Sequence, residues 1–341
     1  MTKLSIPDTR DRAREVMEQL LSGKAEFHDI VKYLKSRPVE SARPHELLGY
    51  RDALWSRRKK ADFSPVALDI VGTGGVRRPR YNVSTTVAFI AAALGVKVAK
   101  HGNRGSVKPN GSCDLLEVLG ISLPALTASA VESLDTTGLT FLFARDWHPA
   151  FGVLASARAE VGSPTVFNLL GPLLNPSLPV YQMVGCGNPA VAHILAETLA
   201  ELGARAIVVT GSDGLDEITL AGSSQLIEIQ GSQISTREIV PEDFGMKTVP
   251  ESEIGGGNAS ENASEFLAIL NGQGRKQLVD LVTLNAAFAL SLVNTDYTVE
   301  QAIGTVRTAL ADGTVEAFFR NFRSFVMNAH KVPKQFVISN S

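Results

Sequence analysis

Two glycine- and hydroxyl-containing segments in the first third of the chain have the composition of an anion site. Residues 72–75 read Gly-Thr-Gly-Gly and directly follow an apolar run at 66–71. The backbone amides of such a turn can approach an anion closely, because no side chain stands in the way. Residues 82–85 read Asn-Val-Ser-Thr and open a helical stretch, whose first turn offers free amides, hydroxyls and the positive end of a helix dipole. A tight turn followed by an ordinary helix cap is the alternative, but the succession of the two segments favours phosphate binding.

A basic loop follows the next apolar run. Lys100, Arg104 and Lys108 stand close together beside glycines and an imidazole, and their charges could neutralise a pyrophosphate. Asn103 lies in the same loop and could orient a substrate. A solvated charged loop is the alternative. Ser112 is expected to cap the helix that begins after the loop.

A third segment contains a candidate carboxylate-binding residue. Arg158 follows His148 by ten residues on a predicted helix, and an arginine can hold a carboxylate through two parallel hydrogen bonds. A surface position is the commoner explanation for such an arginine taken alone. The proline-containing stretch 167–176 is interpreted as a rigid connection that lines the same pocket.

Two adjacent carboxylates, Asp216 and Glu217, form the fourth candidate segment. They lie in a glycine-containing turn, 213–217, that follows an apolar run at 206–209. Magnesium binds proteins through one or two carboxylates, and waters and substrate phosphates complete its coordination. A solvated acidic turn explains 213–217 equally well by itself, but the phosphate-type loops earlier in the chain favour a metal site.

The elements around these segments predict an α/β fold with a mostly parallel sheet. Strand-like and helical stretches alternate, as they do in parallel sheets covered by helices. The strands are expected at residues 66–71, 96–98, 139–143, 181–184 and 206–209. The carboxyl ends of such strands form the ligand crevice, and the candidate segments follow strands in this way. Short alternating runs over 217–240, which include Ile218 and Leu220, suggest antiparallel strands, and helices are expected again from residue 261 onward.

The first sixty residues are predicted to be helical. Apolar residues recur at helical spacing from 12 to 21, with Asp8 as the expected N-cap and Gly23 as the stop. A second helix is expected around 27–34, and a third begins at Pro44.

The bulk composition is that of an ordinary cytoplasmic globular protein. Of the 341 residues 44% are hydrophobic. The formal net charge of -2 does not indicate binding to nucleic acid or to an anionic membrane. The start of the chain has no signal-peptide pattern, and no uninterrupted apolar stretch reaches membrane-spanning length. Cys113 and Cys186 lie far apart and match no metal or disulfide spacing, which favours a reducing compartment.

The candidate segments, taken in this order, resemble those of the anthranilate phosphoribosyltransferases. These are enzymes of the tryptophan pathway, in the class that also contains the pyrimidine nucleoside phosphorylases. The resemblance spans nearly the whole chain. The matching stretches are residues 69–75, 82–85, 100–104, 148–150, 166–176, 214–217, 241–245 and 284–287.

The resemblance implies two domains with the substrates between them. A small all-helical domain would comprise residues 1–64 together with roughly 160–180, and an α/β domain with C-terminal helices would comprise 65–330. Residues 331–341 would form a loose tail. The family also implies a homodimer, usually formed through the helical domain, and magnesium as the cofactor.

The resemblance further assigns roles to individual residues. Phosphoribosyl pyrophosphate would be bound by Gly72, Gly75, Val76, Arg80, Asn82, Val83, Ser84, Thr85, Lys100, His101, Gly102, Asn103, Arg104, Lys108 and Ser112. Anthranilate would be bound by Gly72, Asn103, His148 and Arg158, the last through its carboxylate. Magnesium would be held by Ser84, Asp216 and Glu217. Lys100 and the two carboxylates would supply the electrostatics of the transition state, and no residue is expected to act as a nucleophile.

The chain departs from the family pattern at several donor-facing positions. Val76 replaces an aspartate, Arg80 a threonine, and Lys108 a small hydroxyl residue, while Pro109 and Pro164 replace a lysine and an arginine. The arginines at 77, 78 and 80 either replace lost contacts or indicate a changed donor or acceptor. Two other classes of function therefore stay open: a relative of the same fold, such as a nucleoside phosphorylase or an enzyme with another acceptor, and a non-catalytic nucleic-acid-binding protein.

Overall fold

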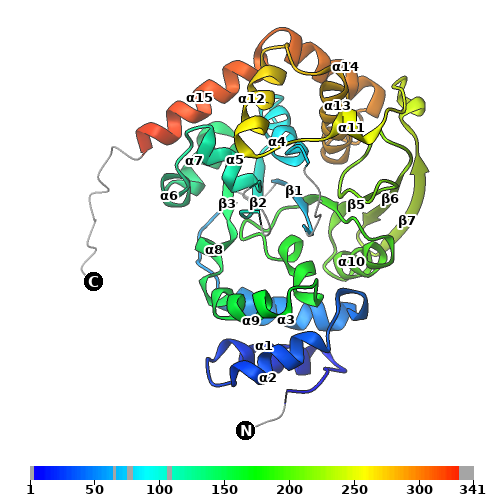
Figure 1. The fold of residues 1–341 in the computed structure, drawn as a ribbon. Helices are drawn as coiled ribbons and strands as arrows, with labels where there is room; N and C mark the ends of the chain where they lie inside the picture. Colours follow the sequence, from blue (N-terminus) through cyan, green and yellow to red (C-terminus); the bar gives the residue numbers. More distant parts are fainter. Residues whose placement is uncertain (1–3, 64–66, 75–79, 106–109, 330–341) are drawn as a thin grey trace.

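A seven-stranded sheet forms the centre of the molecule (Figure 1). The computed structural model describes residues 4–63, 67–74, 80–105 and 110–329. The predicted site residues Gly75, Val76 and Lys108, and the predicted tail, lie outside these ranges. The strands are β1 (Leu68–Gly72), β2 (Val98–Gly102), β3 (Leu139–Phe143), β4 (Tyr181–Gly185), β5 (Arg205–Gly211), β6 (Ser224–Gln230) and β7 (Gln233–Ile239).

The sheet is mixed but mostly parallel, as predicted. Its order is β3-β2-β1-β4-β5-β6-β7, and the first five strands in this order run parallel. β6 and β7 are added antiparallel at one edge. The prediction of an antiparallel strand around Ile218 and Leu220 was wrong. The backbone of Ile218 bonds to the side chain of Asn285 instead of a neighbouring strand.

Two further sequence predictions need correction at element ends. β2 begins at Val98, not at residue 96, because the Val96 amide still bonds to Ala91 at 3.0 Å as the chain leaves a helix. The first helix is capped by Thr9, not Asp8, because the Thr9 hydroxyl accepts the Arg12 amide hydrogen at 3.2 Å.

Helices cover both faces of the sheet. The N-terminal helices are α1 (Arg10–Leu21), α2 (Phe27–Lys35) and α3 (Pro44–Ser56), with the short 3-10 turn η1 (Val39–Ser41) between the last two. The middle of the chain adds α4 (Val83–Ala93), α5 (Ser112–Val118), α6 (Leu123–Ala128), α7 (Ala130–Thr137), α8 (Ala144–Trp147), η2 (Pro149–Leu154), α9 (Ala155–Val161), η3 (Val166–Leu173) and α10 (Pro189–Glu201). The C-terminal part adds η4 (Pro241–Phe244), α11 (Glu251–Ile254), α12 (Ala259–Leu270), α13 (Lys276–Val293), α14 (Val299–Ala311) and α15 (Thr314–Ala329).

Alternate residues of β1 pack into the two largest hydrophobic cores, and a third, smaller core includes Ala99 of β2 and Leu142 of β3. Ile70 of β1 packs in the core formed with α4 and α12–α15, while its neighbour Val71 packs in the core formed with α1–α3 and α10. Successive side chains of a strand point to opposite faces, so one strand serves both cores. Figure 1 shows the two helical layers on opposite sides of the strands. α13 is long and apolar enough to cross a membrane by length and composition, but it is mostly buried in the first core.

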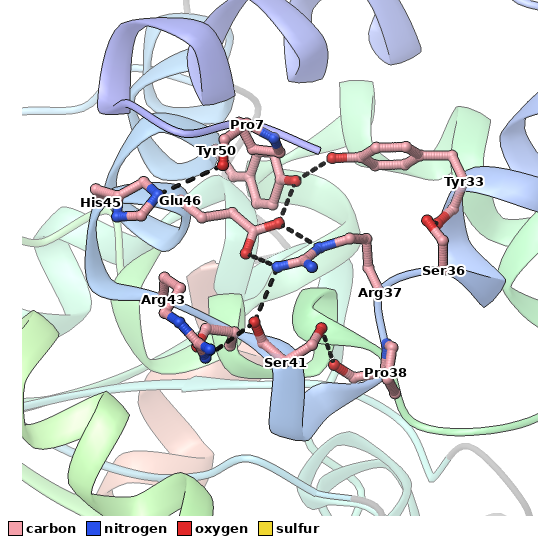
Figure 2. Close-up of polar contacts among 11 residues, drawn as sticks. Pro7, Tyr33, Ser36, Arg37, Pro38, Ser41, Arg43, His45, Glu46 and Tyr50 are labelled. Atoms are coloured by element: carbon pink, nitrogen blue, oxygen red, sulfur yellow. Dashed lines mark hydrogen bonds and ion pairs between the residues drawn. The ribbon is translucent and has the colours of Figure 1, made fainter. Parts of the chain in front are cut away.

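A buried polar cluster organises the N-terminal helices (Figure 2). Arg37, after α2, forms an ion pair with Glu46 of α3, and both side chains are almost fully buried. Tyr50 donates to Glu46 at 2.7 Å, and its hydroxyl also contacts that of Tyr33. Arg37 donates in addition to the Ser41 carbonyl at 2.9 Å. Each charge is therefore paired and hydrogen-bonded, which makes its burial tolerable.

The same cluster ties the N-terminal helices to the middle of the chain. The Arg37 carbonyl accepts the Val166 amide hydrogen at 3.1 Å, and Pro38 forms a β-bridge with Thr165. The Tyr50 ring packs edge-on against Phe167 with 5.1 Å between centroids. These contacts place residues 164–167 against α2 and α3, although the predicted boundary of a separate helical domain stays a prediction.

We expect Glu46→Gln to lower the free energy of unfolding by about 3–5 kcal/mol, because it leaves the buried guanidinium of Arg37 without its counter-ion. Urea denaturation measures this change. Glu18→Gln is the matched control, because Glu18 pairs with Arg14 at 3.0 Å on the exposed side of α1, where such pairs contribute about 0.5 kcal/mol or less. Equal costs for the two substitutions would contradict the assignment of Arg37 and Glu46 as a stability-determining pair.

Candidate functional site

A large cavity of about 1050 Å³ opens at the carboxyl ends of the parallel strands. All four candidate segments contribute to its wall. The predicted site residues that line it are Gly72, Arg80, Asn82, Val83, Ser84, Thr85, Lys100, His101, Gly102, Asn103, Arg104, Ser112, His148, Arg158, Asp216 and Glu217. Every predicted site residue that the structure describes therefore faces the same cavity.

Close backbone packing places the two carboxylates in this cavity. A Cβ atom on Gly72 would lie 2.2 Å from Asp216 Oδ2, and one on Gly185 would lie 1.8 Å from the Asp216 carbonyl oxygen. Only glycine at the ends of β1 and β4 leaves room for this segment. Asn285 of α13 fixes the next residue, because it accepts the Ile218 amide hydrogen at 3.1 Å and donates to the Ile218 carbonyl at 2.8 Å. The carboxylates are thus held from both sides.

The adjacent carboxyl groups of Asp216 and Glu217 are both buried, so their charges are costly without a nearby cation. Burial raises the pKa of Glu217 to about 8, although the charge of Arg80 opposes this and Asp216 adds to it. Arg80 forms an ion pair with Asp216, whose side chain is only 3% exposed. For Arg80 itself, burial lowers the pKa, but the charges of Asp216 and Glu217 outweigh it and the net shift is upward. Even with the Arg80 guanidinium nearby, the pKa of Glu217 therefore stays well above its ordinary value, and a further cation is needed to hold this carboxyl ionised at neutral pH.

A lysine forms the floor of the cavity. Lys100 of β2 is buried and donates to the Ile70 carbonyl of β1. Burial lowers its pKa, and the charge of Asp69 opposes that shift. Asp69 in turn accepts the His101 amide hydrogen at 3.0 Å, and burial raises its pKa to about 6 against the charge of Lys100. The pair of Lys100 and Asp69 leaves little net charge at the floor.

An asparagine network fixes the backbone at Arg80, and its central residue, Asn262, was not predicted from the sequence. The Asn262 amide nitrogen lies 2.8 Å from the Arg80 carbonyl, 2.8 Å from Asn82 Oδ1 and 3.0 Å from Asn110 Oδ1. A Cβ on Gly256 would lie 2.3 Å from the Arg80 carbonyl carbon. The three consecutive glycines at 255–257 were the available signal, because they indicate a close backbone approach next to α12.

The basic loop is arranged differently from its sequence prediction in one respect. Ser112 is the first residue of α5 and not its cap; Gly111 takes the cap position, and Asp114 accepts its amide hydrogen at 2.8 Å. A Cβ on Gly102 would lie 2.3 Å from the Ser112 hydroxyl, so that hydroxyl stands over the end of β2. Arg104 lines the cavity while its guanidinium forms a bidentate pair with Glu117.

The far end of the cavity is aromatic and holds a guanidinium. Arg158 of α9 lies over the Phe151 ring, 5.0 Å from its centroid, and Phe151 packs against Phe167 at 5.9 Å. Burial lowers the pKa of Arg158. No ion pair of Arg158 with a carboxylate is found among the described residues, so its charge is available to a ligand. Arginine beside aromatic rings suits an aromatic carboxylate.

Two histidines separate the two ends and are neutral. His101 Nδ1 donates to the Gly171 carbonyl at 3.1 Å, and His148 Nε2 donates to the Leu174 carbonyl at 2.6 Å. Their rings meet edge-on at 5.6 Å. Burial lowers the pKa of His101 to about 3, with His148 adding to the shift, and burial lowers that of His148 to about 4. They orient the 171–174 backbone and carry no charge at neutral pH.

Comparison with known proteins agrees with this geometry. Residues 64–316 match the model of a family described as glycosyl transferase family, a/b domain. The anthranilate phosphoribosyltransferase of Desulfitobacterium hafniense is 40% identical over 299 residues, which cover 87% of this chain and 89% of that protein. The chain belongs to the anthranilate phosphoribosyltransferase family. The same enzyme of Synechococcus elongatus is 40% identical over 309 residues, 89% of this chain and 88% of the relative.

Solved structures of anthranilate phosphoribosyltransferases share the fold. The crystal structure of the enzyme from Thermus thermophilus gives a TM-score of 0.86 at 34% identity and covers 95% of this chain and 97% of its own. The enzyme from Saccharomyces cerevisiae in complex with PRPP and Mg gives 0.85 at 24% identity, covering 94% of each chain. At that identity the yeast structure supports the fold alone.

The neutral histidines predict a specific pH dependence of stability. Below about pH 6.5 the unfolded chain protonates both histidines, whereas the folded chain holds them neutral down to about pH 4, so the unfolded state binds more protons and stability falls as the pH drops through this window. We expect His148→Gln, which keeps a donor for the Leu174 carbonyl, to reduce the slope of unfolding free energy against pH by up to about one proton between pH 4.5 and 6.5. Urea denaturation at several pH values measures the slope.

The exposed His28 provides the control for this measurement, and His28→Gln should leave the slope unchanged. A slope that is the same in wild type and His148→Gln would show that His148 is not held neutral in the folded protein.

Proposed function

We propose that this anthranilate phosphoribosyltransferase family member transfers the 5-phosphoribosyl group from phosphoribosyl pyrophosphate to the amine of anthranilate in tryptophan biosynthesis. The products are N-(5-phosphoribosyl)anthranilate and pyrophosphate. The observation that carries the proposal is the polarity of the large cavity: phosphate-type loops and a carboxylate pair at one end, and an aromatic wall with the available guanidinium of Arg158 at the other. The two ends match an anionic sugar donor and an aromatic acid.

The donor would lie along the carboxyl ends of β1 and β2. Gly72 and the start of α4 line the cavity, together with Ser84, while the Thr85 hydroxyl is buried beside them without a hydrogen-bond partner. A helix N-terminus and a glycine turn both favour phosphate. Lys100 and Arg104 also line this part of the cavity, next to their carboxylate partners Asp69 and Glu117. Their role is to stabilise the charge that develops on the departing pyrophosphate.

The residues that would hold magnesium are Asp216, Glu217 and Ser84. The donor set fits: all three offer oxygen ligands at the cavity wall, and the raised pKa of Glu217 shows a buried carboxylate in need of a cation. Among the described residues no group of three or more Asp, Glu, His or Cys side chains is arranged to hold a metal by itself. That agrees with an ion that shares its coordination with substrate phosphates, where it would neutralise charge on the pyrophosphate.

The acceptor chemistry needs positioning more than proton transfer. An aromatic amine is already neutral at pH 7, so its lone pair can attack the ribose C1 carbon as the bond to pyrophosphate breaks. The neutral His101 and His148, whose pKa values lie at about 3 and 4, are poor bases at that pH. Arg158 would hold the anthranilate carboxylate, and Asn103 and the Gly72 backbone would border the ring. Most of the acceleration would come from orientation and electrostatics.

We further propose a cytoplasmic homodimer. Cys113 and Cys186 are both buried and free, as expected in a reducing compartment. The support for the dimer is the family resemblance, in which the helical domain usually forms the interface.

The direct test is the fluorescence of anthranilate on addition of the purified protein. We expect the signal to change only when phosphoribosyl pyrophosphate and magnesium are both present. A well-folded protein that gives no change would overturn the proposed function. Release of a free base from a nucleoside with inorganic phosphate would instead identify a phosphorylase.

Arg158→Ala should raise the KM for anthranilate by about ten- to a hundredfold, because it removes a charged bidentate partner worth about 1.5–3 kcal/mol. Steady-state kinetics at saturating donor measures it, and the KM for the donor should stay the same. Arg145→Ala is the matched control, because Arg145 lines the same cavity from α8. Equal KM increases for the two variants would remove Arg158 from the acceptor site.

A further inference from the structure

Arg80 is the residue at which the site departs most clearly from a simple metal-binding pair. Its backbone is clamped, because the Arg80 carbonyl accepts from Asn110 at 3.0 Å and from Asn262 at 2.8 Å. Its side chain reaches the Asp216 carboxylate and forms an ion pair with Oδ1. The Arg80 side chain is 28% exposed, whereas that of Asp216 is 3% exposed. A fixed anchor thus delivers a positive charge to a nearly inaccessible carboxylate.

The two oxygens of Asp216 lie in different surroundings. Oδ2 packs against the backbone of β1, where a Cβ on Gly72 would come within 2.2 Å. Oδ1 carries the contact with Arg80. A cation and a guanidinium cannot take the same oxygen lone pairs at ordinary bonding distances, so a cation that coordinates Oδ1 must compete with Arg80 for it.

An acidic hollow lies directly beside this ion pair. It has a volume of about 620 Å³, and Arg80 lines both this hollow and the main cavity. The carboxylates in its wall are those of Asp213, Glu217, Glu251, Glu261 and Glu265. The arginines in its wall are Arg80 and Arg275, so negative charge is in excess. A guanidinium displaced from Asp216 stays in a favourable field there.

We propose that Arg80 is an internal cation that occupies Oδ1 of Asp216 and gives it up when a divalent cation binds. The inference rests on the proposed role of Asp216 and Glu217 as metal ligands. Arg80 holds the Asp216 carboxylate in place through their ion pair before substrates arrive. Its charge also weakens binding of the metal alone, so the metal binds well only when donor phosphates contribute further ligands. Arg80 acts as a positioning residue in this role and does not touch the reacting atoms.

Metal titration without substrates tests the inference. Mn²⁺ is added to the full chain, and its binding is followed by calorimetry and by the rise in thermal unfolding midpoint. We expect Arg80→Met to bind Mn²⁺ about tenfold more tightly than wild type, because a competing unit charge is lost. The same variant should unfold at a lower temperature in the absence of metal and regain more of that loss on adding Mn²⁺.

Three further variants make the test decisive. Arg104→Met removes a guanidinium from the same cavity that pairs with Glu117 and not with Asp216, and it should leave Mn²⁺ affinity unchanged. Arg80→Lys keeps the charge on a shorter side chain and should bind Mn²⁺ more weakly than Arg80→Met. Asp216→Asn locates the ion, because it should abolish the signal.

The outcomes separate the inference from the proposed function. Unchanged or weaker Mn²⁺ binding in Arg80→Met, with binding still abolished in Asp216→Asn, would overturn the role of Arg80 and leave the metal site in place. Binding that survives in Asp216→Asn would refute the metal site and the inference together. If neither wild type nor Arg80→Met binds Mn²⁺, the competition is refuted as well. Phosphoribosyl transfer is measured separately and does not enter these readouts.

Discussion

The site depends on the close approach of Asp216 to two glycine strand ends, with its carboxylate against Gly72 of β1 and its backbone against Gly185 of β4. Gly72 and Gly185 bring this segment against β1 and β4, so two adjacent carboxylates lie at the crevice of the sheet with little access to water. Burying both charges is costly unless cations are close. Arg80 supplies the nearby cation, and the asparagine network holds the Arg80 backbone in position. The Asn285 contacts fix Ile218, the residue that follows the two carboxylates.

The remaining charges of the cavity are arranged so that the two ends differ in kind. At the floor, Lys100 and Asp69 are both buried and largely compensate each other. The two histidines between the ends are neutral. Among the described cavity residues, uncompensated positive charge therefore remains at Arg158, where a ligand carboxylate would lie. A site of this kind can orient two anionic reactants and stabilise a leaving group without supplying a strong base.

The sequence was informative where local patterns suffice. Glycine turns after apolar runs located the crevice, and each described residue named as a candidate lines the same cavity. It failed where a tertiary contact decides the outcome. Ile218 and Leu220 alternate like a strand, but Asn285, 67 positions beyond Ile218 in the chain, takes the hydrogen bonds of the Ile218 backbone. Asn262 was overlooked for the same reason, since its three partners come from distant segments. Both predicted caps were wrong by one residue: Thr9 caps in place of its polar neighbour Asp8, and Gly111 takes the cap position before Ser112, where Asp114 accepts its amide hydrogen.

The ion pairs Arg37–Glu46 and Arg80–Asp216 differ in how far their side chains are exposed, and this difference matches their roles. Arg37 and Glu46 are both nearly inaccessible, and further hydrogen bonds from Tyr50 and to Ser41 complete the pair. Breaking this pair would leave a buried charge without a partner, which is costly. The pair therefore holds Tyr50 and, through the ring contact of Tyr50, Phe167 in the cavity wall. In the other pair only Asp216 is inaccessible, while Arg80 faces both cavities. The Arg80 guanidinium can leave Asp216 and remain in contact with solvent and with the acidic hollow. A pair that must open when another cation binds requires this.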